Sequence, residues 1–430
     1  MIERMRGALR RRAVLGAFVF SAALGCRDAP PDEAPRITSS GASAEPVASA
    51  CDMIPTPAPS ALGSSSASAT VDEGAGRMEI VLPLARSVAF HVEHRAGIGP
   101  LTTGSSRYDG ERVVAMYQMA AMGLAQLVLD HPSHRGELLP AIRAAADALV
   151  EPETWAFGGA AYNDAKPFDA VEQSAGHAYL GYLDLALGMV RAVDPDTKHA
   201  ALHDRLTVAL ARHLAASNVG VLETYPGEAY PPDIAMVIGA IGLHGRVTGA
   251  DHGAEIESAV RHFRARFVDA RSGFVHQSVD PIRGTPRDAP RGSGTAVSAF
   301  ALAFADADLA GELHRALVAQ GRQDVLSFAG IAEYPPGHTG DADVDAGLVF
   351  LGVGATATAF AIGSARIQRD AELFEALART AETFGDPQER DGRRTYTRGG
   401  AVGDAALLAM YTAGPLTAQR DGAARRNTNR

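Results

Sequence analysis

Stretches of the chain that are apolar on all sides alternate with stretches that have one apolar and one polar face. The apolar stretches, rich in glycine and alanine, cover 109–129, 170–193, 232–247, 293–305, 344–366 and 401–413. The amphipathic stretches cover 78–92, 139–150, 199–215, 256–268, 309–318 and 373–384. A helix that is apolar all round is buried, whereas a helix with one polar face lies at a surface. The alternation therefore predicts an all-α fold, an (α/α)6 toroid of six helical hairpins with a buried inner ring.

The lengths of the predicted connections give this ring a direction. Connections from an apolar helix to the next amphipathic helix are short, as at 194–196 and 248–251, whereas those that lead back to an apolar helix are long. All long connections then gather at the N-terminal end of the inner helices, which we call the mouth. Long loops in a compact domain are usually functional, and concave openings are the usual ligand sites. We therefore expect the working surface at the mouth.

The N-terminal residues have the pattern of a bacterial export signal. Several arginines precede an apolar stretch, 13–24, that is too short to span a bilayer. Ala23-Leu24-Gly25-Cys26 resembles a lipobox, whose cysteine is lipidated, and Arg27 in place of aspartate favours outer-membrane sorting. We expect a lipoprotein that crosses the inner membrane and is anchored in the cell envelope through Cys26. An ordinary secretory signal cleaved nearby is the alternative.

Composition sets the remaining boundaries of the predicted domains. We expect a lipoprotein signal peptide at 1–25, a disordered tether rich in alanine, serine and proline at 26–76, the toroid at 77–415 and a disordered tail at 416–430. The net charge of −10, without a basic stripe, argues against nucleic acid as a partner. Both cysteines, Cys26 and Cys51, precede the toroid, which excludes thiol catalysis within it. We predict neither a cofactor nor a metal ion.

Candidate catalytic residues lie where the long connections enter the apolar helices. Asp109, Asp233 and Asp345 each fall in or near a first helical turn. Helix capping and the helix dipole explain aspartate there without any catalytic role. If several converge, burial and repulsion separate their pKa values, which provides the general acid and the base or nucleophile of glycoside hydrolysis. His177, expected inside the second apolar helix, is either a satisfied core group or an acid/base in the pocket.

The long connections also carry aromatic and polar side chains suited to sugar rings. Flat aromatic faces contact the CH groups of a sugar, while charged groups bond to its hydroxyls. The predicted substrate-binding residues are Tyr108, Trp155, Tyr162, Glu228, Tyr230, Arg291, Tyr334 and His338.

The six-hairpin pattern over 78–413 resembles the (α/α)6 toroids of bacterial glycoside hydrolases, polysaccharide lyases and sugar epimerases. This resemblance rests on architecture, and no family-specific catalytic motif accompanies it. It implies an enzyme that acts on a glycan or another polyhydroxylated small molecule by carboxylate acid/base chemistry. A weaker resemblance, to linalool dehydratase/isomerase-like toroids, implies a terpenoid-type isomerase or dehydratase, whose proposed chemistry uses cysteines that this domain lacks. A non-catalytic binding or assembly lipoprotein is the third reading.

Overall fold

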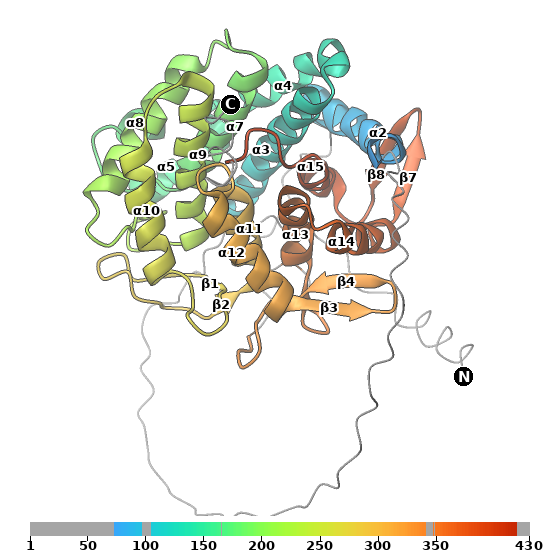
Figure 1. Ribbon diagram of the computed structural model, residues 1–430. Coiled ribbons are helices and arrows are strands. Elements are labelled where there is room, and N and C mark those ends of the chain that lie inside the picture. The colour runs from blue at the N-terminus through green and yellow to red at the C-terminus, as the bar shows by residue number, and fades with distance from the viewer. Residues whose placement is uncertain (1–72, 97–104, 165, 341–346, 348, 419–430) are drawn as a thin grey trace, which may run out of the picture.

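A computed structural model describes residues 73–96, 105–164, 166–340, 347 and 349–418. These residues form the predicted (α/α)6 toroid (Figure 1). The inner helices are α3 (Ser106–Asp130), α7 (Leu180–Val193), α9 (Pro231–Thr248), α11 (Gly292–Leu302), α13 (Ala355–Gln368) and α15 (Gly400–Tyr411). Each inner helix packs on the next in this order, and α15 packs on α3, which closes the ring.

Amphipathic helices surround this ring. They are α2 (Glu73–His94), α4 (Arg135–Leu149), α8 (Ala200–Ala216), α10 (Gly253–Arg266), α12 (Ala307–Ala316) and α14 (Ala371–Phe384). In α10, Val260 and Phe263 are buried at helical spacing, while Glu257 and Arg261 are exposed. Helix α2, first in the chain, packs on α15, the last inner helix, and on α4. The outer ring therefore closes at the same place as the inner one.

Glycines bring neighbouring inner helices close together. A Cβ atom at Gly239 on α9 would lie 2.3 Å from the carbonyl oxygen of Ala301 on α11. A Cβ atom at Gly123 on α3 would lie 2.8 Å from the backbone nitrogen of Ala409 on α15. Both contacts are shorter than any carbon side chain tolerates, so glycine is required where these backbones meet.

Among the described helices, α3 alone is long and apolar enough to cross a membrane by length and composition. Its most apolar window has a mean hydropathy of 1.4, but 83% of that window is buried inside the domain. Core helices of globular proteins meet the same criterion, and α3 is a core helix here.

The connections follow the predicted lengths. Inner helices lead to outer ones through short segments, such as 249–252 between α9 and α10. The long connections carry all the described strands and short helices except η1 (Pro132–His134). The short helices are η2 (Pro152–Trp155), α5 (Ala156–Tyr162), α6 (Pro167–Ala170) and the π-helical η3 (Leu317–Gly321). The strands form four antiparallel pairs: β1 (Val275–His276) with β2 (Pro290–Arg291), β3 (Arg322–Val325) with β4 (Phe328–Ile331), β5 (Val349–Phe350) with β6 (Val353–Gly354), and β7 (Pro387–Arg390) with β8 (Arg393–Tyr396).

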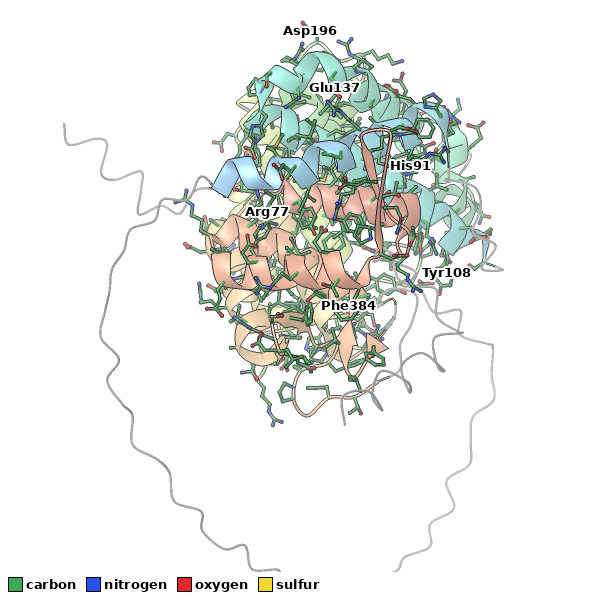
Figure 2. The ribbon with its side chains drawn as sticks, turned by 90° about the vertical axis from the view of Figure 1, so that its right-hand side faces the viewer. Arg77, His91, Tyr108, Glu137, Asp196 and Phe384 are labelled. Atoms are coloured by element: carbon green, nitrogen blue, oxygen red, sulfur yellow. The ribbon has the colours of Figure 1, made fainter. Side chains whose placement is uncertain are left out.

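Figure 2 shows the direction of the ring from the side. Arg77 and His91 lie toward opposite ends of α2, and Tyr108, near the start of α3, lies on the same side of the molecule as His91. The outer helix therefore runs toward the mouth and the inner helix away from it, as the loop lengths predict.

Two predicted inner helices are shorter than expected. The stretch 170–193 is helical only from Leu180, because Gly176 and His177 adopt left-handed backbone angles, with φ of 104° and 66°. In the stretch 344–366, β5 and β6 form a hairpin whose turn contains Gly352 at φ of 84°, and α13 begins at Ala355. A short apolar run fits a buried strand as well as a helix, so the composition of the stretch 344–366 did not distinguish the β5–β6 hairpin from a longer helix.

Candidate functional site

Asp233 is a buried carboxylate at the mouth, in the first turn of α9. Its side chain accepts hydrogen bonds from the Tyr182 hydroxyl on α7, at 2.8 Å, and from the Thr224 hydroxyl, at 2.6 Å. Burial raises the pKa of Asp233 to about 6, although both hydroxyls oppose that rise. Neither bond goes to a backbone N–H of α9, so these contacts are not those of a capping aspartate.

A second buried carboxylate, Glu111 on α3, is held by the residue next to Thr224. The Tyr225 hydroxyl donates to Glu111 Oε1 at 2.7 Å. Thr224 and Tyr225 thus tie carboxylates on α9 and α3 to one loop. The following Pro226-Gly227 makes a tight turn, with Gly227 at φ of 80° and the Glu228 N–H bonded to the Tyr225 carbonyl. Both hydroxyl-bearing residues therefore lie directly before a tight turn.

Aromatic and charged groups pack against the Tyr225 ring, and Tyr225 is 1% exposed. Tyr179 stacks on it with ring centroids 5.7 Å apart, and the Arg107 guanidinium lies 4.4 Å from its centroid. Arg107 also pairs with Glu228 at 3.3 Å, and Glu228 accepts a hydrogen bond from Tyr230 at 2.9 Å. The Tyr225 ring is therefore buried among protein groups, whereas Tyr230 is only partly buried.

His177 lies in the loop before α7 and not inside a helix. Its Nε2 is 3.0 Å from Asp164 Oδ2, and its ring stacks on Tyr162 with centroids 3.9 Å apart. The Tyr162 hydroxyl accepts from the His177 backbone N–H and donates toward the carbonyls of Glu223 and Thr224. Burial lowers the pKa of His177, opposed by Asp164. His177 and Tyr162 therefore brace the loop that carries Thr224.

A third buried carboxylate, Glu333, belongs to the loop after β4 and contacts the first residues of α11. The Ser293 hydroxyl donates to Glu333 Oε1 at 2.6 Å, and the Gly292 N–H donates to the Glu333 carbonyl at 2.7 Å. Arg291, 5% exposed, lies with its guanidinium 5.4 Å from the Tyr334 ring centroid. The loop after β4 thereby brings a carboxylate and a half-buried aromatic ring to the mouth, next to the Arg291 guanidinium of β2.

Asp404 on α15 is a fourth buried carboxylate. It accepts from the Tyr396 backbone N–H at 2.7 Å, and His91 Nε2 lies 3.4 Å from its other oxygen. Burial raises the pKa of Asp404, opposed by His91 and the Tyr396 N–H.

Other predicted site residues are placed differently from the mouth carboxylates. Trp155 is 1% exposed and packs against Phe157 and Tyr179, so it lies in the core below the loops and not on the rim. Tyr108 is half-buried at the start of α3, where the Ser105 side chain caps the helix.

Asp109 is partly exposed in that first turn, and its charge acts on Arg112. His338 is half-buried in the turn after Tyr334. Asp345 and Cys26 lie outside the described residues.

The sequence prediction included Asp233 but not Glu111, Tyr182, Tyr179 or Asp404. A usable signal existed for two of them. Asp404 is the single acid of the otherwise apolar α15, and Glu111 lies where the long apolar run of α3 begins; an ionisable group buried in such a helix needs a partner. Among the described residues, one group of histidine and acidic side chains has the spacing of metal ligands, and it lies away from the mouth.

Comparison with solved structures finds the same architecture at low identity. A family 105 glycoside hydrolase from C. acetobutylicum ATCC 824 aligns with a TM-score of 0.50 and 11% identity, over 78% of this chain and 98% of that chain. The GH76A alpha-1,6-mannanase from Salegentibacter sp. HEL1_6 aligns with a TM-score of 0.49 and 12% identity, over 77% and 98%. The unsaturated glucuronyl hydrolase from Bacillus sp. GL1 aligns with a TM-score of 0.47 and 14% identity, over 78% and 95%.

Comparison with protein-family models and with curated proteins finds no match. At such identities, a shared structure speaks for the fold alone. The alignment with the family 105 enzyme confirms the resemblance to (α/α)6 toroid glycosidases as a resemblance of fold.

Proposed function

We propose that the toroid is an enzyme that acts on a glycan or similar polyhydroxylated substrate by carboxylate acid/base chemistry at its mouth. The observation that carries this proposal is Asp233, a carboxyl group with a pKa raised to about 6. A buried group with a perturbed pKa in the expected position of a ligand site is a functional candidate. The fold of the solved toroid glycosidases supports the substrate class by analogy only.

Asp233 is assigned the general acid. With a pKa of about 6 it retains its proton in mildly acidic conditions, where an ordinary aspartate is ionised. Tyr182 and Thr224 position the group, and their hydroxyls can accept from the protonated acid as well as donate to the ionised one. Glycosidic bond cleavage needs this proton on the leaving oxygen.

Glu111 is assigned the second carboxylate, as base or nucleophile. It is tied to the same loop as Asp233 through the Tyr225 hydroxyl. An ionised carboxylate serves to activate water or to attack the sugar, depending on its separation from the acid. The half-buried rings of Tyr108, Tyr230 and Tyr334 are assigned to the sugar faces, because Tyr225 is buried among protein groups.

The cellular address belongs to the same proposal. A lipid on Cys26 would hold the enzyme at the cell envelope, most consistently the outer membrane, with residues before the toroid as its tether. This rests on the lipobox-like sequence Ala23-Leu24-Gly25-Cys26. An enzyme placed there meets envelope and extracellular glycans.

Single substitutions assayed on a glycan panel test the catalytic assignment. Asp233→Asn and Glu111→Gln should each lower turnover by about 10²–10⁴-fold, the usual contribution of a general acid or base. Asp184→Asn is the matched control, because Asp184 is equally buried on an inner helix but bonds to Thr207 on α8. Full activity in both mouth variants would rule out the assignment.

A non-catalytic glycan-binding lipoprotein is the second candidate. It is favoured by the occupancy of both Asp233 oxygens by protein hydroxyls, which a purely structural carboxylate also shows. Saturable sugar binding without turnover, unchanged in Asp233→Asn, would support this candidate over the enzyme. The charged and hydroxyl-rich mouth disfavours a terpenoid-type isomerase, which would need an apolar funnel.

A further inference from the structure

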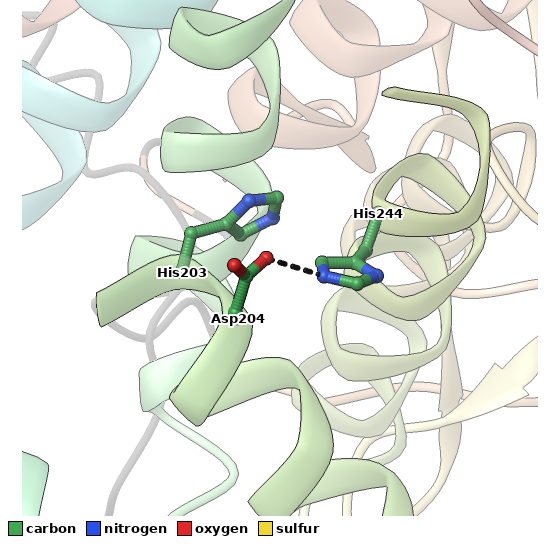
Figure 3. A group of neighbouring side chains, drawn as sticks. All are labelled: His203, Asp204 and His244. Carbon is green, nitrogen blue, oxygen red and sulfur yellow. Dashed lines mark hydrogen bonds and ion pairs between the residues drawn. The ribbon is translucent and has the colours of Figure 1, made fainter. Parts of the chain in front are cut away.

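A cluster of histidine and aspartate side chains lies at the end of the ring opposite the mouth. His203 and Asp204 are in the first two turns of α8, and His244 is near the C-terminal end of α9 (Figure 3). Each offers one ligand atom, and these atoms all lie within 4.8 Å of one another. His244 Nε2 lies 2.9 Å from Asp204 Oδ1.

His203 is a buried polar side chain without a hydrogen bond. Its residue exposure is 0%, and neither ring nitrogen has a hydrogen-bond partner among the described atoms. Its ring lies edge-on to that of His244, with centroids 4.9 Å apart. Leaving a buried polar group unpaired is costly, so such a group calls for a ligand.

Asp184 lies near the His203 ring but accepts its hydrogen bonds from another residue. Asp184, whose oxygens accept from Thr207, has Oδ1 3.9 Å from His203 Nε2. A neutral imidazole has a free nitrogen lone pair, which is what a metal ion binds.

We propose that His203, Asp204 and His244 bind one divalent zinc-type cation that links α8 to α9. Two imidazoles and one carboxylate, completed by water, are a ligand set that Zn²⁺ accepts. His244 Nδ1 lies 3.0 Å from His252 Nε2, the second contact by which metal-bound histidines are commonly oriented. The Asp204 side chain, 48% exposed, offers the ion a path from solvent.

Arg191 supplies an internal test of this site. Its guanidinium contacts Asp204 Oδ1, the same oxygen that lies against His244. A cation bound there is repelled by that guanidinium. Arg191→Gln should therefore bind the metal more tightly than the wild type, and equal or weaker binding would overturn the assignment.

Isothermal titration of the untagged, EDTA-treated full chain with ZnCl₂ tests the proposal directly. We expect one ion per chain and a higher Tm in its presence. Asp204→Asn and His244→Gln should weaken binding at least about tenfold, the lower end of what even outer partners of metal ligands cost. The exposed His94→Gln and Asp196→Asn variants are controls and should bind like the wild type.

Cobalt gives a second readout that does not depend on enzymatic activity. Co²⁺ bound by these three ligands should show the intense visible bands of a four-coordinate site, and Asp204→Asn should lose them. Circular dichroism establishes that each variant is folded. Absence of saturable binding in the wild type, or unchanged binding in both folded ligand variants, would overturn the proposal.

Discussion

The buried Asp233 carboxyl should make stability depend on pH with a sign opposite to that of an ordinary paired aspartate. Its folded-state pKa is about 6, against an ordinary value of 3.8. The folded state therefore holds the proton more tightly than the unfolded state. The contribution of this proton to the stability of the folded state is fully present below pH 3.8, falls as the pH rises, and is lost above about pH 6.

The size of this effect follows from the two pKa values. At 1.36 kcal/mol for each pKa unit, the interval from 3.8 to about 6 amounts to about 3 kcal/mol. Asp233 is 3% exposed, so solvent screening reduces this figure little. Asp233→Asn keeps the shape of the protonated acid and cannot ionise. The variant should match the wild type at low pH and exceed its stability by up to about 3 kcal/mol at pH 8.

Urea unfolding of both proteins at several pH values between 4 and 8 measures this difference. Trp155, the single tryptophan of the chain and a buried one, reports unfolding by fluorescence. Other titrating groups change both proteins alike, so the difference between them isolates Asp233. A difference that is flat over this range, or a wild type that gains relative stability as the pH rises, would refute the buried-acid interpretation.

Three further predictions test the packing, the acid assignment and the anchor. Gly239→Ala should destabilise the fold by about 1–3 kcal/mol, because its Cβ would meet the Ala301 carbonyl, whereas Gly136→Ala on α4, with open space around it, should be neutral or slightly stabilising in the same denaturation assay. Tyr182→Phe removes a hydrogen bond that lowers the pKa of Asp233, so the alkaline limb of the kcat/KM profile should move to higher pH. If the limb does not move, Asp233 is not the group whose ionisation produces it. Cys26→Ser should transfer the protein from the membrane fraction to the soluble fraction of a Gram-negative host and abolish labelling with a fatty-acid analogue, and retention of the label would place the lipid elsewhere.

The ring was predictable from the sequence because it follows from a local property. Helices apolar on all sides have to be buried, and amphipathic ones have to face solvent, so the alternation alone orders the two layers. The loop lengths then predicted which end of the ring forms the mouth. Asp233 was predicted as a site residue because it lies where a long loop enters an apolar helix. These inferences need no knowledge of which residues meet in space.

Long-range contacts and backbone turns could not be predicted from the sequence. The partners of Asp233 come from α7 and from the α8–α9 loop, and the partner of Glu111 comes from that same loop, so the site exists only once α3, α7 and α9 have packed together. The left-handed angle of His177 shortened a predicted helix; histidine adopts this angle more often than most residues do, but one histidine in an apolar stretch does not predict it. His203 and His244 are likewise brought together by the packing of α8 on α9.

An oligosaccharide bound to the Asp233→Asn variant in a crystal would test the central claim most directly. We expect the sugar chain to lie at the N-terminal end of the inner helices, with a glycosidic oxygen within about 3 Å of the position 233 side chain. A sugar bound at the opposite end of the ring, or at the mouth with its glycosidic oxygens beyond the reach of both residue 233 and Glu111, would contradict it.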